Sequence, residues 1–373
     1  IEFGENLSQE KLSKLEGLLK ATKNDYELAL FYAQVKQFAK AEKGMLNDSS
    51  ANGITLLAFV YQVQNKIDLA ITTAELAITK KSYIAYKILA EIYQQQDTLT
   101  KAEKYYLLAI KHDIPDCYLE LSDIYVETEQ LKLAEKYALL AVQHNEKNAS
   151  FKLGEIYFQL DQFEQAKNIF LTELEKENFD NDIYRYLTWI YIDENQRETA
   201  EKYLQLGLDN HTFGVNMIAG YFYYWVDDYS AAKPYLMQSI DEGYTSVLSI
   251  LANIYQIEEN LPLAEEYYIK SLEADNDEAE LDLADFYFSN IQTESKAKAL
   301  ALAEKSIKTN TTFEAENSYI SILLWNNNFE LASQVMESLL TTITFDDQKQ
   351  ESQLIQLFTL FLAKDQTNLV DRW

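Results

Sequence analysis

The chain has few of the residues that break helices. Only 9 glycines and 3 prolines occur among its 373 residues. A β-sandwich needs many tight turns, and glycine and proline supply most of them. Their scarcity therefore argues against an all-β fold and favours long stretches of helix. We predict an all-α protein.

Cysteine and histidine are scarcer still. Cys117 is the single cysteine, so no disulfide can form within the chain, and His112, His144 and His211 are the only histidines. The sequence has no His-x-x-x-His pair and no glycine-rich phosphate loop. Zinc sites, dithiol chemistry and P-loop nucleotide binding therefore lack their usual ligands. We predict no catalytic residues, no metal and no cofactor, and hence a protein that is not an enzyme.

Basic residues are outnumbered, with 32 Lys and Arg against 60 Asp and Glu and a formal net charge of −28. Nucleic acids and anionic membranes attract Lys and Arg, so both are disfavoured as partners. A negative field favours encounter with a basic protein, although acidic surfaces also simply keep proteins soluble. No apolar run approaches the ~20 residues that span a bilayer, so membrane insertion is not expected.

The compartment is left open by these observations. Residues 1–4 read as a cloning remnant, so a signal peptide or a lipid anchor could have preceded residue 6. The cytoplasm is slightly favoured, with secretion or the periplasm as the alternative. Abundant Asn, Gln, Lys and Tyr hint at a bacterial source of low GC content.

Tyrosine recurs through most of the chain, usually 32 residues apart. The series is Tyr32, Tyr61, Tyr93, Tyr125, Tyr157, Tyr191, Tyr223, Tyr255 and Tyr287. An alanine follows each of the first eight by nine residues: Ala41, Ala70, Ala102, Ala134, Ala166, Ala200, Ala232 and Ala264. Such self-similarity at a fixed period indicates a repeat architecture.

The residues four and three positions before each tyrosine are also regular. The fourth is Leu in every unit except one, and the third is a small residue such as Ala29, Gly154 or Gly220. Offsets of three and four define one face of a helix. We therefore predict that each unit is a helix-turn-helix whose small residues let the backbones approach, and that neighbouring units stack.

The last units depart from the pattern. Tyr287 is followed by Ala299, which implies about three extra residues near 292–294. A tenth unit has Leu323 in place of tyrosine, with Ala332 nine residues later.

His112 and His144 fall one repeat apart, where each second helix should end. Steps such as Glu103-Lys104 fall on second helices, where we expect them only to be solvated.

The ends of the chain read as capping helices. We predict an N-terminal capping helix in residues 5–24, a repeat array in residues 25–340, and a C-terminal capping helix and tail in residues 341–373. Solenoids need such caps to cover the apolar faces of their end repeats. The apolar positions of the second cap, Leu354, Leu357 and Phe361, fit capping better than the alternative, which is pairing with a second copy.

Two of the repeats resemble a known family. Leu153-Gly154-x-x-Tyr157 followed by Ala166-x-x-x-Phe170 resembles the tetratricopeptide signature, as does Ala102-Glu103-Lys104-Tyr105-Tyr106 with Ala109. The stretch from Ala102 to Tyr125 also resembles Sel1-like repeats. The Trp and Pro typical of tetratricopeptide units are largely missing, and the period is 32 rather than about 34.

The resemblance covers roughly residues 25–340. It implies a right-handed superhelical α-solenoid of about ten helix-turn-helix repeats. It also implies that the first helices line a concave groove that holds peptides or protein segments.

Five offsets from each tyrosine, −9, −6, −2, +1 and +2, lie opposite the core face of the first helix and should line that groove. In units five to seven they are unusually rich in aromatic residues. The candidates there are Phe151, Phe158, Arg185, Trp189, Ile192, Met217, Tyr221, Tyr224 and Trp225. Tyr, Trp and Arg often dominate interface energies, so the set predicts a binding site. The alternative is that these rings are buried against one another.

The −2 position carries an acid in units three to five, namely Glu91, Asp123 and Glu155. This ladder predicts a site for Lys or Arg of a partner, with a solvated acidic face as the alternative. The favoured function is a non-catalytic scaffold or adaptor that binds a protein or peptide, and the acidic charge would suit a basic one. The alternatives are an acidic inhibitor or immunity protein that masks a basic toxin or nuclease, and a self-associating structural component.

Overall fold

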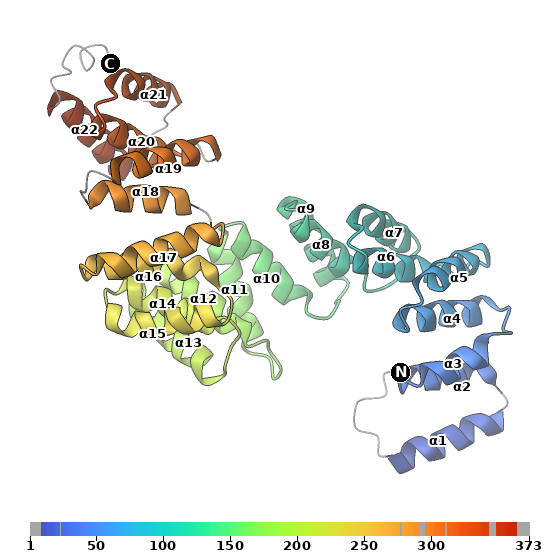
Figure 1. Cartoon of the computed structure of the whole chain (residues 1–373). Helices are drawn as coiled ribbons and strands as arrows, with labels where there is room; N and C mark the ends of the chain where they lie inside the picture. Colours follow the sequence, from blue (N-terminus) through green and yellow to red (C-terminus); the bar gives the residue numbers. More distant parts are fainter. Residues whose placement is uncertain are drawn as a thin grey trace. The chain divides into compact units, whose positions relative to one another are not determined.

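A computed structural model describes residues 9–22, 24–276, 278–290, 295–309, 312–342 and 348–363. Their regular structure is entirely helical, with 22 α-helices and one 3-10 helix, and these ranges contain no strand (Figure 1). The prediction of an all-α protein is confirmed. The extra residues predicted near 292–294 lie outside the described residues.

Internal contacts divide the chain into two compact units, residues 1–183 and residues 184–373. The first unit holds α1 (Gln9–Thr22), α2 (Asp25–Gln34), α3 (Phe38–Met45), α4 (Ala51–Val63), α5 (Ile67–Thr79), α6 (Ala85–Gln95), α7 (Leu99–Lys111), α8 (Tyr118–Glu127), α9 (Leu131–Gln143), α10 (Ala149–Gln159) and α11 (Phe163–Glu173).

The division falls near the start of α12 (Asp182–Asp193). The second unit continues with α13 (Arg197–Asp209), α14 (Val215–Trp225), α15 (Tyr229–Asp241), the 3-10 helix η1 (Thr245–Val247), α16 (Leu248–Ile257), α17 (Leu261–Glu273), α18 (Ala279–Ser289), α19 (Ser295–Thr309), α20 (Phe313–Trp325), α21 (Phe329–Thr342) and α22 (Gln348–Ala363).

First and second helices alternate along the chain. From α2 and α3 to α20 and α21, the described residues make ten such pairs, the number that the sequence predicts. Helix pairs such as α4 with α5 and α14 with α15 pack closely, and within each compact unit neighbouring pairs also contact one another, as α5 does α6 and α15 does α16. The fold is an α-solenoid.

The turn between the two helices of a pair uses a left-handed residue without glycine. The residue four positions after the repeat tyrosine, or after Leu323 in the last pair, has a positive φ in every pair in which this residue is described: Lys36, Asn65, Asp97, Glu129, Asp161, Asn195, Asp227, Glu259 and Asn327. The next N–H bonds back to the carbonyl oxygen of the repeat tyrosine, as Gln130 does to Tyr125 at 2.8 Å. This is the Schellman arrangement, which ends the first helix.

The repeated small residues allow the paired helices to approach. A Cβ on Gly154 would lie 2.7 Å from Cε1 of Phe170, and one on Gly220 would lie 2.4 Å from Cδ2 of Leu236. Both partners are fully buried in second helices. The alanines nine residues after each tyrosine, from Ala41 to Ala264, are also fully buried. The predicted core face is confirmed.

The repeat tyrosines connect neighbouring pairs. Tyr125 in α8 donates a hydrogen bond of 2.7 Å from its hydroxyl to Glu103 in α7, and Tyr287 does the same to Glu265. The prediction that the Glu103-Lys104 step is only solvated was wrong, because the glutamate accepts this bond between repeats. Tyr125 also stacks on Tyr137 of its own pair, with ring centres 5.3 Å apart.

The two end helices cover apolar faces within their own units. Leu12, Leu15 and Leu19 of α1 pack against the first core cluster. Leu354, Leu357 and Phe361 of α22 are buried in the last cluster, which leaves them unavailable to a second copy. The predicted division at residues 24 and 340 stays a prediction, and residues 1–8 and 364–373 lie outside the described residues. Among the described helices, none is both long and apolar enough to span a membrane.

Candidate functional site

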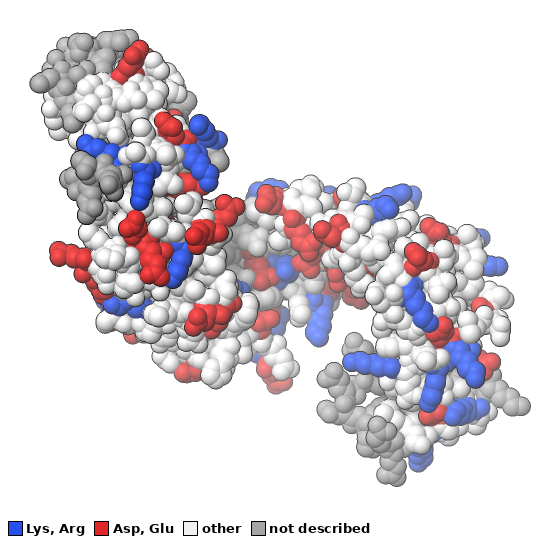
Figure 2. Space-filling view, in the orientation of Figure 1, with Lys and Arg blue, Asp and Glu red and all other residues white. Residues whose placement is uncertain are grey.

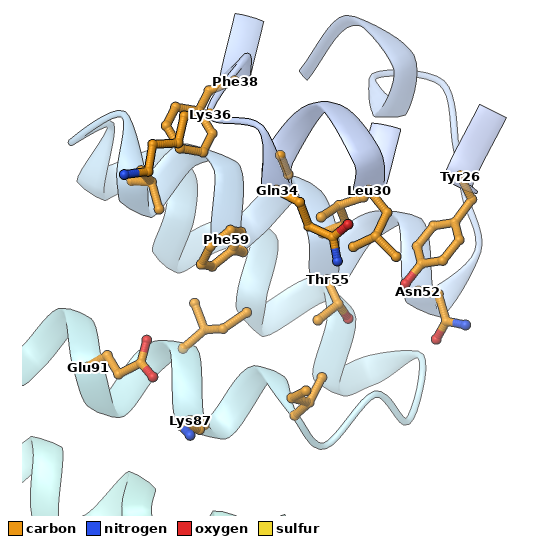
Figure 3. Close-up of a pocket in the computed structure, with 15 residues that line it drawn as sticks. Tyr26, Leu30, Gln34, Lys36, Phe38, Asn52, Thr55, Phe59, Lys87 and Glu91 are labelled. Carbon is orange, nitrogen blue, oxygen red and sulfur yellow. The ribbon is translucent and has the colours of Figure 1, made fainter. Parts of the chain in front are cut away.

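An open apolar cavity of about 800 Å³ lies across α2, α4 and α6, the first helices of the first three repeats (Figure 3). We call it the N-terminal groove. Its lining is Tyr26, Leu30, Ala33, Gln34, Lys36, Phe38, Asn52, Thr55, Leu56, Phe59, Val63, Ile84, Lys87, Ile88 and Glu91.

The lining follows the predicted offsets. Leu30, Phe59 and Glu91 each lie two residues before a repeat tyrosine, and Asn52 and Ile84 lie nine before. Side chains at these positions point away from the core because the core occupies the opposite side of each first helix. The predicted face is therefore correct for these repeats, but the cavity lies in units one to three, whereas the aromatic candidates lie in units five to seven.

The middle of the groove exposes large apolar side chains. Phe59, Val63 and Ile84 are 38%, 45% and 48% exposed. Large apolar side chains are usually buried when a protein folds. A group of them exposed side by side is typical of a surface that binds a partner. The sequence reasoning missed these residues because it searched for aromatic density. Apolar residues at the five groove offsets were the signal that could have found them.

Polar side chains surround this apolar centre. Figure 3 shows Gln34 of α2 and Asn52 and Thr55 of α4 beside the apolar side chains. The hydroxyl of Thr55 is already bonded to the carbonyl oxygen of Ala51 and to Ser82, both at 2.7 Å. The exposed amide of Asn52 can donate to and accept from the N–H and C=O groups of a peptide backbone. The groove therefore combines apolar contact area with an amide group that can bind a main chain.

The charged groups of the groove lie at its margins. Lys87 donates a hydrogen bond of 3.4 Å to the carbonyl oxygen of Pro115, and its Nζ lies 3.9 Å from Oδ2 of Asp116. Glu91 accepts a hydrogen bond of 3.0 Å from Nε2 of Gln62. Lys36 is exposed in the left-handed turn after α2.

A row of four carboxylates continues from the groove along α6, α8 and α10. This acid row is Glu91, Glu120, Asp123 and Glu155. Burial raises the pKa of Glu120, and the charges of Asp123 and Glu91 raise it further. Glu120 thus lies close enough to Glu91 and Asp123 of the predicted ladder for their charges to affect it, and the binding role of the ladder stays a prediction.

Lys152 of α10 occupies part of the acid row. Its Nζ lies 3.0 Å from Asp123 and 3.0 Å from Glu155. Burial lowers the pKa of Lys152, but these two carboxylates outweigh it, so its pKa lies above the ordinary value. A basic group from a partner would therefore share these acids with an internal lysine.

Charge is unevenly distributed along the sequence. Residues 1–98 contain 11 of the 32 basic and 12 of the 60 acidic residues, so nearly the whole negative excess follows residue 98. Figure 2 shows lysine side chains crowded over the part of the molecule that holds α2 to α5, where the sequence has no arginine. The N-terminal groove thus lies in a nearly neutral part of an acidic protein.

The aromatic candidates of units five to seven are all half-buried. Phe151 and Phe158 belong to the first compact unit, where they contact Phe170 and Phe163 at ring-centre distances of 5.9 and 5.4 Å. The other seven candidates belong to the second unit.

Within the second unit the rings pack on one another. Trp189 meets Tyr221 edge to face at 5.3 Å, and Arg185 lies over the ring of Tyr186 at 4.7 Å. Tyr224 donates a hydrogen bond of 3.0 Å to Asn253. The remaining candidates, Ile192, Met217 and Trp225, pack against the cluster around Phe222. All of these candidate side chains are only partly buried, so the binding role of the set stays a prediction.

The histidines lie where the repeat predicts. His112 and His144 follow the last residues of α7 and α9 as their C-caps, and His112 stacks on Tyr83 with ring centres 3.8 Å apart. Among the described residues, no group of three or more His, Cys, Asp and Glu side chains is arranged to hold a metal ion.

One repeat of the sequence matches a known family model. Residues 148–172, which span α10 and most of α11, match the model of the tetratricopeptide repeat. This stretch is therefore a tetratricopeptide repeat, and the ten described helix pairs agree with an array of such repeats. The Sel1-like part of the resemblance is not confirmed. No curated protein matches the sequence.

Solved structures share the tetratricopeptide fold. The Cut9–Hcn1 hetero-tetramer of the APC/C is 13% identical, with a TM-score of 0.50 over 97% of this chain and 82% of that chain. YrrB, described as a TPR protein with an unusual peptide-binding site, is 21% identical, with a TM-score of 0.41 over 48% of this chain and 94% of that one. PilF of Pseudomonas aeruginosa is 15% identical, with a TM-score of 0.44 over 51% and 91%. At such identities the likeness concerns the fold alone.

A tetratricopeptide array is a scaffold for protein–protein interactions, and such scaffolds are typically non-catalytic. Each repeat offers one first helix to a shared surface, so the array presents a row of adjacent side chains over many repeats.

Proposed function

We propose that this tetratricopeptide protein is a non-catalytic scaffold that binds a peptide or protein segment in its N-terminal groove. One observation carries the proposal: three adjacent first helices line one apolar cavity of about 800 Å³, in which Phe59 and Val63 of α4 and Ile84 at the start of α6 are exposed. Binding pockets of this size are usual, and an apolar lining with a few polar groups is their common composition.

The contacts available in the groove suit a peptide. Phe59 and Ile84 offer surface for apolar side chains of the ligand, while the exposed amide of Asn52 offers hydrogen bonds to its backbone. Burying such apolar surface contributes roughly 25 cal/mol per Å² before the costs of association are subtracted. The groove therefore supports recognition of a short segment rather than of a flat protein surface.

The proposal is tested by selecting binding peptides from a random library with the purified full chain and measuring their affinities by calorimetry. Phe59→Asp places a charge in the apolar centre and is expected to weaken binding at least about tenfold. Phe213→Ala changes an exposed ring of the second unit and is the control. Peptides that bind the native chain and the Phe59→Asp variant equally would refute the N-terminal groove as the binding site.

The aromatic residues of units five to seven remain a second candidate binding surface. Their test is the triple variant Trp189→Ala, Tyr221→Ala and Trp225→Ala, compared with the native chain by the same calorimetry. Loss of peptide binding in a variant that keeps its helical circular dichroism would assign the site to the aromatic set. Equal binding would make these rings part of the core.

An acidic inhibitor that masks a basic protein is a second candidate function. The observation that favours it is the acidic excess after residue 98, together with the acid row. Its association rate with a basic toxin or nuclease should fall steeply with salt. An association rate that salt does not change would remove this candidate.

Self-association is the third candidate. The helix α22 leaves Ile355, Leu360 and Leu362 exposed, whereas Leu354, Leu357 and Phe361 are buried. Analytical ultracentrifugation over a range of concentrations tests this candidate, and a monomer at high concentration would exclude it.

A further inference from the structure

Glu91 of α6 belongs both to the N-terminal groove and to the acid row. Its charge acts on Glu120 of α8, which in turn is affected by Asp123. Asp123 and Glu155 of α10 share Lys152. A ligand that extends from the groove toward α10 therefore passes from apolar side chains onto carboxylates.

The charges along the acid row are unequal. Two cations accompany the acid row, Lys87 and Lys152, and each is already held near a carboxylate of the chain. Asp116 adds a further acid beside Lys87. The acids outnumber the lysines, and half-burial strengthens their attraction for a cation, because charges interact more strongly where water is partly excluded.

An unsatisfied acceptor lies at the junction. Gln62 is only 7% exposed, and its Nε2 donates to Glu91, which holds that carboxylate at the edge of the groove. Its Oε1 is buried and has no hydrogen-bond donor among the described residues. The buried amide of Gln62 therefore fixes the Glu91 carboxylate at the place where the groove meets the acid row.

We infer that the groove and the acid row together bind one protein segment in which an apolar stretch adjoins a basic stretch. This inference rests on the proposed function and names the class of its partner. The apolar stretch lies on Phe59 and Ile84, and Lys or Arg side chains lie on Glu120, Asp123 and Glu155. The negative field of the whole chain also attracts such a segment.

Three designed peptides test the inference by calorimetry with the full chain. The first joins a leucine-rich half to a lysine-rich half, the second replaces each lysine by glutamine, and the third replaces each lysine by glutamate. We expect the lysine peptide to bind tightest and the glutamate peptide weakest. Equal affinity for the lysine and glutamate peptides overturns the inference.

Two sets of variants locate the basic stretch. Asp123→Asn combined with Glu155→Gln should weaken binding of the lysine peptide about five- to tenfold and leave the glutamine peptide unchanged. Lys152→Gln removes the internal competitor, so it should tighten binding of the lysine peptide about two- to fivefold. The control, Asp68→Asn with Glu75→Gln, removes two exposed acids from the second helix α5.

The outcomes separate this inference from the proposed function. If the acid-row variant binds the lysine peptide as well as the native chain does, or if Lys152→Gln weakens that binding, the basic stretch is refuted and the groove is not. If Phe59→Asp leaves all leucine peptides bound, both proposals fail. Circular dichroism of each variant ensures that a loss of affinity is not a loss of fold.

Discussion

Tyr125 donates its hydroxyl hydrogen to Glu103, which belongs to the second helix of the preceding repeat, over 2.7 Å. The same bond joins Tyr287 to Glu265, and Tyr32 bonds in the same way to Glu16 of α1 at 2.9 Å. The repeat tyrosine thus packs inside its own helix pair and also ties that pair to its neighbour. A solenoid is stable only through such contacts between repeats.

Tyr125→Phe removes this bond and leaves the ring in place. We expect a loss of about 1–2 kcal/mol in the free energy of unfolding, because the half-buried carboxylate of Glu103 loses its donor. Urea denaturation monitored by circular dichroism measures the loss. Tyr61→Phe is the control, since no hydrogen bond of the Tyr61 hydroxyl is present among the described residues, and its stability should hardly change. Equal effects of the two substitutions would contradict the role given to Glu103.

Glu129→Gly should stabilise the chain. Glu129 lies in the turn that follows α8 and adopts the left-handed conformation, with φ of 57°. A residue with a side chain is strained in this conformation, whereas glycine is not. We expect the free energy of unfolding to rise by about 0.5–1 kcal/mol. Glu75→Gly, in the exposed interior of α5, is the matched control and should lower it by about 1 kcal/mol. A loss of stability in Glu129→Gly would show that the side chain has a role beyond the turn.

Gly220→Ala should destabilise the chain although alanine is the better helix former. The new methyl group would meet Leu236 at 2.4 Å, and Leu236 is fully buried, so the two helices must separate. We expect a net loss of about 1–3 kcal/mol by urea denaturation. Gly17→Ala in α1 is the control: a Cβ there meets no atom within 4 Å, and stability should rise or stay level. A stable Gly220→Ala variant would refute the close approach of α14 and α15.

Stability should fall in alkaline solution. Burial raises the pKa of Tyr268 from 10.0 to about 12, and burial also raises the pKa values of Tyr106, Tyr125 and Tyr287. The folded state holds these protons more tightly than the unfolded state does. The contribution of these tyrosines to the free energy of unfolding is therefore fully present below pH 10. It then decreases as the pH rises toward 12.

Urea titrations at pH 8, 10 and 11 measure the decrease. Tyr268→Phe should lower the stability at pH 8, because its hydrogen bond to Gln256 is lost, and should make the decline above pH 10 shallower. A decline of the same slope in the variant would mean that Tyr268 does not contribute to it.

Much of the fold could be predicted because it depends on contacts between residues close in sequence. Tyrosine, alanine and small residues at constant spacing identify the core face of each helix pair, and stacking of identical pairs repeats that geometry. The turn residues were not recognised, because Lys36, Glu129 and Glu259 adopt the left-handed conformation that glycine usually marks.

The site was harder to predict. The five groove offsets were derived from helical periodicity alone, and they describe the lining of the N-terminal groove. Which repeats leave these positions open depends on how neighbouring helices pack, which periodicity does not encode. Aromatic density drew attention to Trp189 and Tyr221, yet these rings contact one another, whereas the smaller side chains Val63 and Ile84 are left exposed.

By itself, then, the sequence determined the helical class, the ten helix pairs, their core residues and the acidic character of the chain, because each of these is a local or compositional property. Only the tertiary structure decided that Glu103 binds Tyr125, that Lys152 lies between Asp123 and Glu155, and that Glu91 joins the groove to the acid row. These relationships join different repeats, and side-chain packing between repeats sets their distances.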